Sequence, residues 1–198
     1  MKIDNKIYKL ALTGLIAALS YVVFTFLQIK IPLGAGDAVS IHFGNAVCVL
    51  GALLGGGLVG GLGGAIGMSI GDLFDPVYVI YAPKTFILKL LIGLITGFVA
   101  HNIGRISFTD DRKHIARFAF GAAIAGLLFN AVADPLLGYY YKILILGKPA
   151  ADLMIAWNAG VSLFNSVTNS IVSGIIYMAL RPALVKSGLF MKIGKDRA

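Results

Sequence analysis

Glutamate is absent from this chain of 198 residues, and all nine of its acidic residues are aspartates. Charged residues make up 13% of the sequence, whereas about a quarter is usual for a soluble globular domain. The Glu- and Lys-rich helix surfaces of soluble proteins are therefore missing. Apolar residues reach 58% and the mean hydropathy is +0.87, which together indicate a protein that lies within a membrane.

Cysteine occurs only once, as Cys48, which excludes an internal disulfide and any metal site with several cysteine ligands. The three histidines lack the spacing of a metal motif such as H-E-x-x-H. The phosphate-binding pattern G-x-x-x-x-G-K-[ST] is also absent, so the chain has no P-loop for ATP. We therefore expect no metal and no cofactor in this chain, and a catalytic residue only under the alternative of an intramembrane enzyme.

Basic residues give the chain a net charge of +8, and most of them lie in three clusters. The clusters are near the N-terminus, between residues 105 and 117, and after residue 181. Each cluster flanks an apolar segment, as the positive-inside rule requires of cytoplasmic loops. The charge is thus a topology signal rather than evidence for nucleic-acid binding.

Six apolar segments follow one another along the chain. The expected spans are residues 9–28, 41–55, 58–73, 83–103, 116–137 and 153–180. The second and third are shorter than the roughly 20 residues of a full span. With six spans, both termini and all three basic clusters lie inside, and the connections at 29–41, 74–82 and 138–152 lie outside. The sequence predicts an all-α integral membrane protein, a single compact bundle of six transmembrane helices with cytoplasmic termini.

Glycine is concentrated between residues 34 and 84. Residues 55–57 predict a tight turn, and glycines recur every four residues along 58–73. In lipid, small residues let helices approach closely. The pattern Gly67-Met68-Ser69-Ile70-Gly71 also matches the G-x-S-x-G motif of hydrolases, but that motif requires a strand-to-helix elbow and a later histidine. Close helix packing is the better interpretation of these glycines.

Polar residues recur on one face of the last span, at Asn158, Ser162, Asn165 and Asn169. Such a face must meet protein or water, because an unsatisfied amide is costly in lipid. Two interpretations stay open: an internal network that holds the bundle together, or a ligand site near the outer surface. A channel or a structural membrane subunit is a further alternative.

Charged residues also enter the predicted spans near their outer ends. A lysine or aspartate at mid-bilayer costs roughly 2.5–3.5 kcal/mol, so such residues are usually paired, snorkelling or functional. Lys84 can snorkel, and we expect Lys89 to pair with Asp72 or Asp134. An intramembrane enzyme that uses Ser69 or the carboxylates of Asp72, Asp75 and Asp134 is another alternative. Nearby aromatic residues (Tyr78, Tyr81, Tyr139, Tyr140 and Trp157) suit a small, flat, mostly neutral organic ligand.

Several segments together resemble a known family. They are LALTGLIAALSYVVF, IHFGNAVCVLGALLGG, GGxxGxxxGDLF and YAPKTFILKLLIGLITG. They are similar to the substrate-binding S component of energy-coupling factor (ECF) vitamin importers, in the riboflavin-transporter-like branch that includes pyridoxine and hydroxymethylpyrimidine binders. The resemblance covers most of residues 8–180 and is firmest over 41–75 and 80–97.

The resemblance implies a multi-pass protein of the bacterial plasma membrane that binds a vitamin from outside with high affinity. It implies a transmembrane coupling protein and two cytoplasmic ATPases as partners, which use the ATP. The family's small-residue motif, which faces the coupling protein, corresponds to Gly14 and Ala18. The expected cargo is pyridoxine-like or hydroxymethylpyrimidine-like first, and riboflavin second.

Nine residues are the expected substrate contacts, and they come from three places. Asp37, His42 and Asn45 come from the first loop and second helix. Asp72, Tyr81 and Lys84 come from the region that follows the glycine-rich span 58–73, counting its last turn. Asn158, Ser162 and Asn165 come from the last helix.

Overall fold

Six long helices and one β-hairpin make up the computed structural model, which describes residues 5–34, 37–147 and 152–190. The elements are α1 (Asn5–Phe26), β1 (Gln28–Gly34), β2 (Asp37–His42), α2 (Gly44–Gly55), α3 (Gly57–Leu73), α4 (Ala82–Gly97), α5 (Arg112–Tyr140) and α6 (Asp152–Lys186). Short turns of π-helix, Phe98–Ile103 and Tyr141–Ile145, continue α4 and α5, and 3₁₀ turns cover Val79–Tyr81 and Ile106–Phe108.

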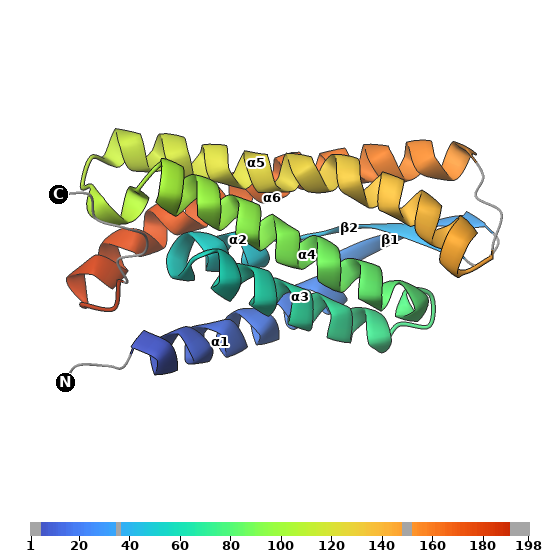
Figure 1. The fold of residues 1–198 in the computed structure, drawn as a ribbon, viewed down its shortest axis with the longest axis horizontal. Coiled ribbons are helices and arrows are strands. Elements are labelled where there is room, and N and C mark those ends of the chain that lie inside the picture. Colours follow the sequence, from blue (N-terminus) through green and yellow to red (C-terminus); the bar gives the residue numbers. More distant parts are fainter. Residues whose placement is uncertain (1–4, 35–36, 148–151, 191–198) are drawn as a thin grey trace.

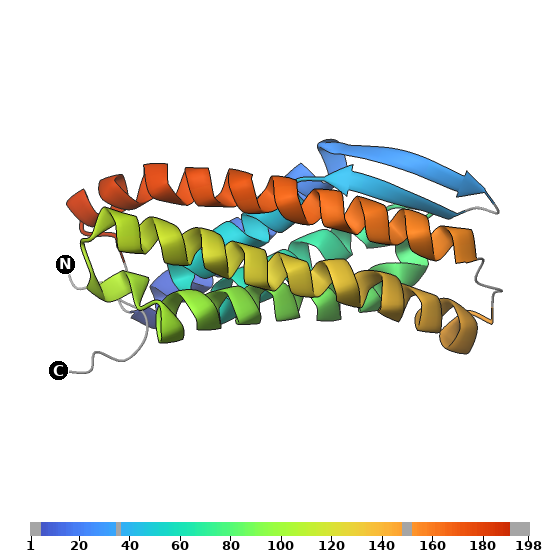
Figure 2. The same ribbon diagram turned by 90° about the horizontal axis from the view of Figure 1, so that it is seen from above.

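The helices run roughly along one long axis, so the molecule has two distinct ends (Figures 1 and 2). The start of α1, the turn between α2 and α3, the start of α5 and the end of α6 lie together at one end, here called the terminal end. The β-hairpin, the connection from α3 to α4 and the end of α5 lie at the other, here called the hairpin end. This arrangement separates the basic clusters of the described residues from the hairpin.

Four helical segments are long and apolar enough to cross a membrane. They are Lys6–Phe26, Val79–Ile103, Arg112–Ile145 and Ile155–Lys186. The helices α2 and α3 are apolar but shorter, as the sequence predicted. The described residues are therefore mostly helical and include four candidate membrane spans, whereas six complete crossings and cytoplasmic termini remain predictions.

Most of the segment predicted as an outer loop, at residues 29–34 and 37–41, instead forms two antiparallel strands, so the all-α prediction was wrong here. Gln28 pairs with His42, and the register is irregular between Pro32 and Gly34. In a sheet of two strands both strands are edges, and an edge strand tolerates proline because its N–H is not needed by a further strand. The hairpin also shortens the second predicted span, since α2 begins at Gly44.

Helix α3 contacts three neighbouring helices through its glycines. A Cβ added at Gly60 would lie 2.1 Å from a backbone nitrogen of α2, and one at Gly67 would lie 2.1 Å from a backbone oxygen of α1. A Cβ at Gly61 would lie 2.7 Å from a backbone oxygen of α4. Gly56, with a φ of 92°, makes the turn from α2 into α3. The predicted close packing of these helices is thus confirmed.

Candidate functional site

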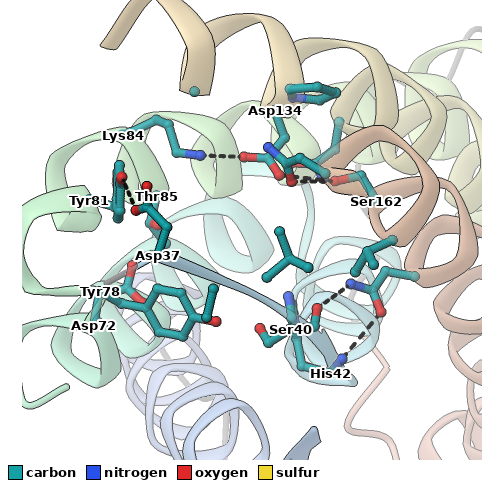
Figure 3. Close-up of a pocket in the computed structure, with 18 of the residues that line it drawn as sticks. Asp37, Ser40, His42, Asp72, Tyr78, Tyr81, Lys84, Thr85, Asp134 and Ser162 are labelled. Atoms are coloured by element: carbon teal, nitrogen blue, oxygen red, sulfur yellow. Dashed lines mark hydrogen bonds and ion pairs between the residues drawn. The ribbon is translucent and has the colours of Figure 1, made fainter. Parts of the chain in front are cut away.

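A polar cavity of about 130 Å³ lies between the hairpin and the ends of α3, α4, α5 and α6 (Figure 3). All nine residues predicted as substrate contacts line this one cavity. They are Asp37, His42, Asn45, Asp72, Tyr81, Lys84, Asn158, Ser162 and Asn165. Residues that are far apart in the sequence therefore lie around one cavity. That they contact a substrate remains a prediction.

The aromatic wall is smaller than the sequence suggested. Tyr78, Tyr81 and Tyr139 line the cavity. Tyr140 and Trp157 are instead 56% and 47% exposed and lie outside the lining. Both sit on outward faces of α5 and α6, where an aromatic side chain suits the membrane interface.

Two asparagines of α6 hold the hairpin and the start of α2. The Asn165 amide donates to the Ser40 carbonyl at 2.9 Å, and its oxygen accepts from the His42 N–H at 3.2 Å. The Asn169 amide donates to the His42 carbonyl at 3.0 Å and accepts from the Ala46 N–H at 2.8 Å. Part of the polar face of the last span therefore binds backbone groups at the end of β2 and the start of α2, where the Ala46 N–H also donates to the Phe43 carbonyl at 3.0 Å.

An ion pair joins α4 to α5 along one wall of the cavity. The Lys84 ammonium lies 2.6 Å from Asp134 Oδ1, and the Ser162 hydroxyl donates to Asp134 Oδ2 at 3.0 Å (Figure 3). Lys84 therefore faces a carboxylate and does not snorkel. Asn158 lies one turn before Ser162, with 3.5 Å between Asn158 Oδ1 and the Ser162 hydroxyl.

A second ion pair ties the hairpin to α4 and to the end of α5. Asp37 Oδ1 accepts from the Tyr81 hydroxyl at 2.8 Å, and Asp37 Oδ2 lies 2.9 Å from the Lys142 ammonium. Tyr141 adds a hydrogen bond from its hydroxyl to the Ile80 carbonyl at 2.9 Å. Lys142 was not among the predicted site residues, because it lies in a segment that the sequence predicts to be an outside loop. The run of tyrosines directly before it was the available signal.

Lys89 also lines the cavity, although its side chain is only 6% exposed. Within residues 5–34, 37–147 and 152–190, its ammonium makes no hydrogen bond and no ion pair, so the expected pairing with Asp72 or Asp134 was wrong. Asp134 is engaged by Lys84 instead. A buried lysine without a close carboxylate is costly, and such residues are usually functional.

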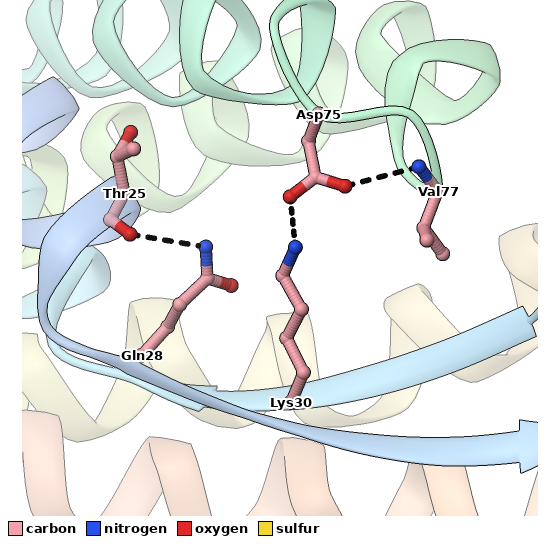
Figure 4. Close-up of polar contacts among 5 residues, drawn as sticks. All are labelled: Thr25, Gln28, Lys30, Asp75 and Val77. Atoms are coloured by element: carbon pink, nitrogen blue, oxygen red, sulfur yellow. Dashed lines mark hydrogen bonds and ion pairs between the residues drawn. The ribbon is translucent and has the colours of Figure 1, made fainter.

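Lys30 and Asp75 anchor the outer side of the hairpin (Figure 4). Lys30 forms an ion pair with Asp75, which also accepts from the Val77 N–H at 3.0 Å. Burial opposes the charge on Asp75, but Lys30 and the Val77 N–H together lower the pKa of this carboxyl below its ordinary value. The Lys30 ammonium lies 5.4 Å from the ring centre of Tyr78, and burial raises the pKa of the Tyr78 hydroxyl to about 12.

Several side chains in the lining carry buried polar atoms that have no hydrogen-bond partner in the described part of the chain. They include His42 Nδ1, Asn45 Oδ1 and Asn130 Oδ1. Buried polar groups in folded proteins nearly always have a partner, either protein or water. Their presence around one cavity indicates a place where a polar molecule completes the hydrogen bonding.

Gly14 and Ala18 lie on an exposed face of α1. Nothing lies within 4 Å of a Cβ built at Gly14, so this face is not packed against the described bundle. The position is open to another membrane helix, and contact with a partner remains a prediction.

The alternatives based on catalysis find no support in the geometry. Ser69 lies within α3 and donates to the Ala82 carbonyl at 3.2 Å, so it is part of helix packing and not an elbow. Asp75 and Asp134 are engaged in separate ion pairs. No group of three or more metal-ligating side chains occurs among the residues that the structure describes.

Comparison with protein families matches residues 4–182 to the ECF-type riboflavin transporter, S component. Comparison with curated proteins finds no significant match, and comparison with solved structures likewise finds none. Members of the matched family are substrate-binding subunits of vitamin transporters in the membrane, not enzymes. Because the match covers most of its length, the chain belongs to the family of ECF-type riboflavin transporter S components.

Proposed function

We propose that this S component captures a small water-soluble vitamin from outside the cell and delivers it with a coupling protein and two ATPases. A pyridoxine-like or hydroxymethylpyrimidine-like molecule is the first choice, and riboflavin is the second. The observation that carries the proposal is the cavity at the hairpin end, with its convergent polar side chains and aromatic walls. Pockets of this composition are typical of small organic ligands.

The size of the cavity favours one ring over three. Its volume is about 130 Å³. An engineered apolar cavity of about 150 Å³ in another protein holds one benzene molecule. A flavin has three fused rings and a sugar-alcohol chain, so it would fit only if the cavity opened further, which makes riboflavin the second choice.

The charges around the cavity favour a cargo without net charge. Three aspartates and three lysines line it, so their formal charges cancel. The aspartates are Asp37, Asp72 and Asp134, and the lysines are Lys84, Lys89 and Lys142. A phosphorylated vitamin would bring uncompensated negative charge into this buried site, which is costly.

The proposed direction of transport follows from charge at the two ends. The described basic residues Lys6, Lys9, Arg112 and Lys113 lie on segments that meet at the terminal end, and positive loops are cytoplasmic. The cavity is near the hairpin end and would then face outward. The open face at Gly14 and Ala18 is where we place the coupling protein.

Mass spectrometry of the small molecules that copurify with the chain tests this proposal. We expect a vitamin with one ring, released on denaturation in about equal amount to the protein. Calorimetric titration of the purified chain with pyridoxine, hydroxymethylpyrimidine and riboflavin should rank them in the same order. A chain that binds no vitamin, alone or with its coupling partners, would contradict the proposal, whereas tight riboflavin binding would retain the transporter and change only the cargo.

A further inference from the structure

Two of the three lysines around the cavity are already paired. Lys84 lies 2.6 Å from Asp134, and Lys142 lies 2.9 Å from Asp37. These pairs join neighbouring elements, so their charges are balanced by the protein itself. They shape the site, but they leave little charge with which to select a ligand.

Lys89 and Asp72 are the remaining charges. Both are buried, with 6% and 2% of their surface exposed, and both line the cavity. They project from adjacent helices, Asp72 from the last turn of α3 and Lys89 from the second turn of α4. In the described part of the chain they form no ion pair with each other or with another residue. The hydroxyl of Thr85, one turn before Lys89, is the hydrogen-bond partner of the Asp72 carboxylate.

We propose that Lys89 and Asp72 are a split charge pair that recognises a zwitterionic hydroxypyridine. The deprotonated 3-hydroxyl oxygen of the ligand accepts a hydrogen bond from the Lys89 ammonium. The protonated ring nitrogen of the ligand donates a hydrogen bond to Asp72. This inference rests on the proposed function, since it names the chemical class of the cargo.

The chemistry of this ligand class fits both residues at once. A 3-hydroxypyridine exists in water partly as a zwitterion, with the proton on the ring nitrogen and the negative charge on the oxygen. Bound between Lys89 and Asp72, it gives each buried charge an opposite charge, and the sum stays zero. Hydrogen bonds between ionised partners are about twice as strong as neutral ones. A neutral aminopyrimidine offers a donor and an acceptor but no charge for Lys89.

Titration calorimetry with pyridoxine as the probe tests the proposal on the full chain in detergent. We expect Lys89→Met to bind about 100-fold more weakly than the wild type, and Lys89→Arg to recover part of the loss. Lys113→Gln is the matched control, because Lys113 is exposed at the start of α5, and it should bind as the wild type does. The affinity of the wild type for pyridoxine should also fall when the pH drops below the pKa of the ligand's 3-hydroxyl group. The affinity of Lys89→Met should not depend on pH in this range.

A change in the ligand provides a test that does not depend on folding of a variant. Pyridoxine that is methylated on its 3-hydroxyl oxygen cannot form the anion, so it should bind the wild type about 100-fold more weakly than pyridoxine does. Equal binding of the two ligands, or full affinity in a folded Lys89→Met chain, overturns the proposal. If the wild type binds another vitamin and not pyridoxine, this inference fails while the proposed function stands. If no vitamin binds, both fail.

Discussion

The side-chain oxygen of Asn165 accepts a hydrogen bond from the backbone N–H of His42 at 3.2 Å, across 123 residues of sequence. One turn further along α6, Asn169 makes the same kind of contact with the Ala46 N–H at 2.8 Å. The last helix therefore holds the hairpin and the start of α2 in place. The shape of the cavity depends on these contacts.

Replacement of Asn169 by alanine should lower the stability of the folded chain. It removes the hydrogen bonds to the His42 carbonyl and from the Ala46 N–H, which keeps only the Phe43 carbonyl as an acceptor, so the expected loss is about 1–3 kcal/mol. Thermal unfolding in detergent measures the loss. Thr168→Ala is the matched control, because its hydroxyl contacts only carbonyls of its own helix. Equal melting temperatures for the two variants would contradict this role for Asn169.

Replacement of Gly67 by alanine should be strongly destabilising. Its Cβ would lie 2.1 Å from the Ala17 carbonyl, so α1 and α3 would have to separate. Overpacking of this kind costs about 1–3 kcal/mol or more. The comparison is Gly121→Ala, where nothing lies within 4 Å and helix propensity should stabilise the chain by about 0.5–1 kcal/mol. The melting temperature should fall for Gly67→Ala and rise for Gly121→Ala, and an unchanged or higher melting temperature for Gly67→Ala would show that α1 and α3 are not tightly packed there.

Replacement of Lys84 by methionine should destabilise the chain by about 3 kcal/mol, because it leaves the Asp134 carboxylate without its cation in a largely buried place. The double variant Lys84→Met with Asp134→Leu should recover much of this loss, since neither charge remains. Unfolding free energies of the wild type, both single variants and the double variant measure the coupling. Additive effects would mean that the two residues do not interact.

The hairpin should loosen in acid. The folded-state pKa of Asp75 lies below the unfolded-state value of about 3.9, so its carboxylate stabilises the fold above that pH, and the stabilisation is lost as the pH falls through the folded-state value. The difference in stability between the wild type and Asp75→Asn should therefore be largest near neutral pH and shrink below about pH 4. Thermal unfolding at several pH values measures it. A difference that does not change with pH would exclude this ion pair as its source.

Substitution of Ala18 by leucine should reduce vitamin uptake by vesicles that contain the complete transporter, because a larger side chain would keep a partner helix at a distance. Vitamin binding by the isolated chain should be unchanged, since Ala18 faces away from the cavity. Gly121→Leu places the same side chain on another open surface and is the control. If both variants transport as the wild type does, α1 does not contact the coupling protein through this face.

Much of this architecture was predictable from the sequence because lipid imposes strict rules. The polar face of the last span had to meet protein or water, and glycines every four residues required close neighbours. These two rules were sufficient to bring Asn158, Ser162 and Asn165 together with residues from the hairpin end of α3 and α4.

The hairpin and the ion pairs were less predictable. Strand pairing at 28–42 depends on a partner segment that the local sequence, with Pro32 and several glycines, does not reveal. The choice of Asp134 by Lys84 and not by Lys89 depends on the rotation of α4, which no single-sequence periodicity determines. Lys142 was missed because it lies on the short π-helical turn after α5, where its contact with Asp37 depends on the fold and not on the local sequence.

The glycines of α3 have a mechanical consequence. Where two helices meet at backbone distance, no side-chain rotamer can change to accommodate a shift, so α1, α2, α3 and α4 must behave as one stiff block. Polar contacts of Asp37 and Asp75 join the hairpin to that block, whereas Asn165 joins it to α6. We therefore expect any rearrangement that opens the cavity to be confined to the hairpin and to the parts of α5 and α6 at the hairpin end, while the block keeps its shape.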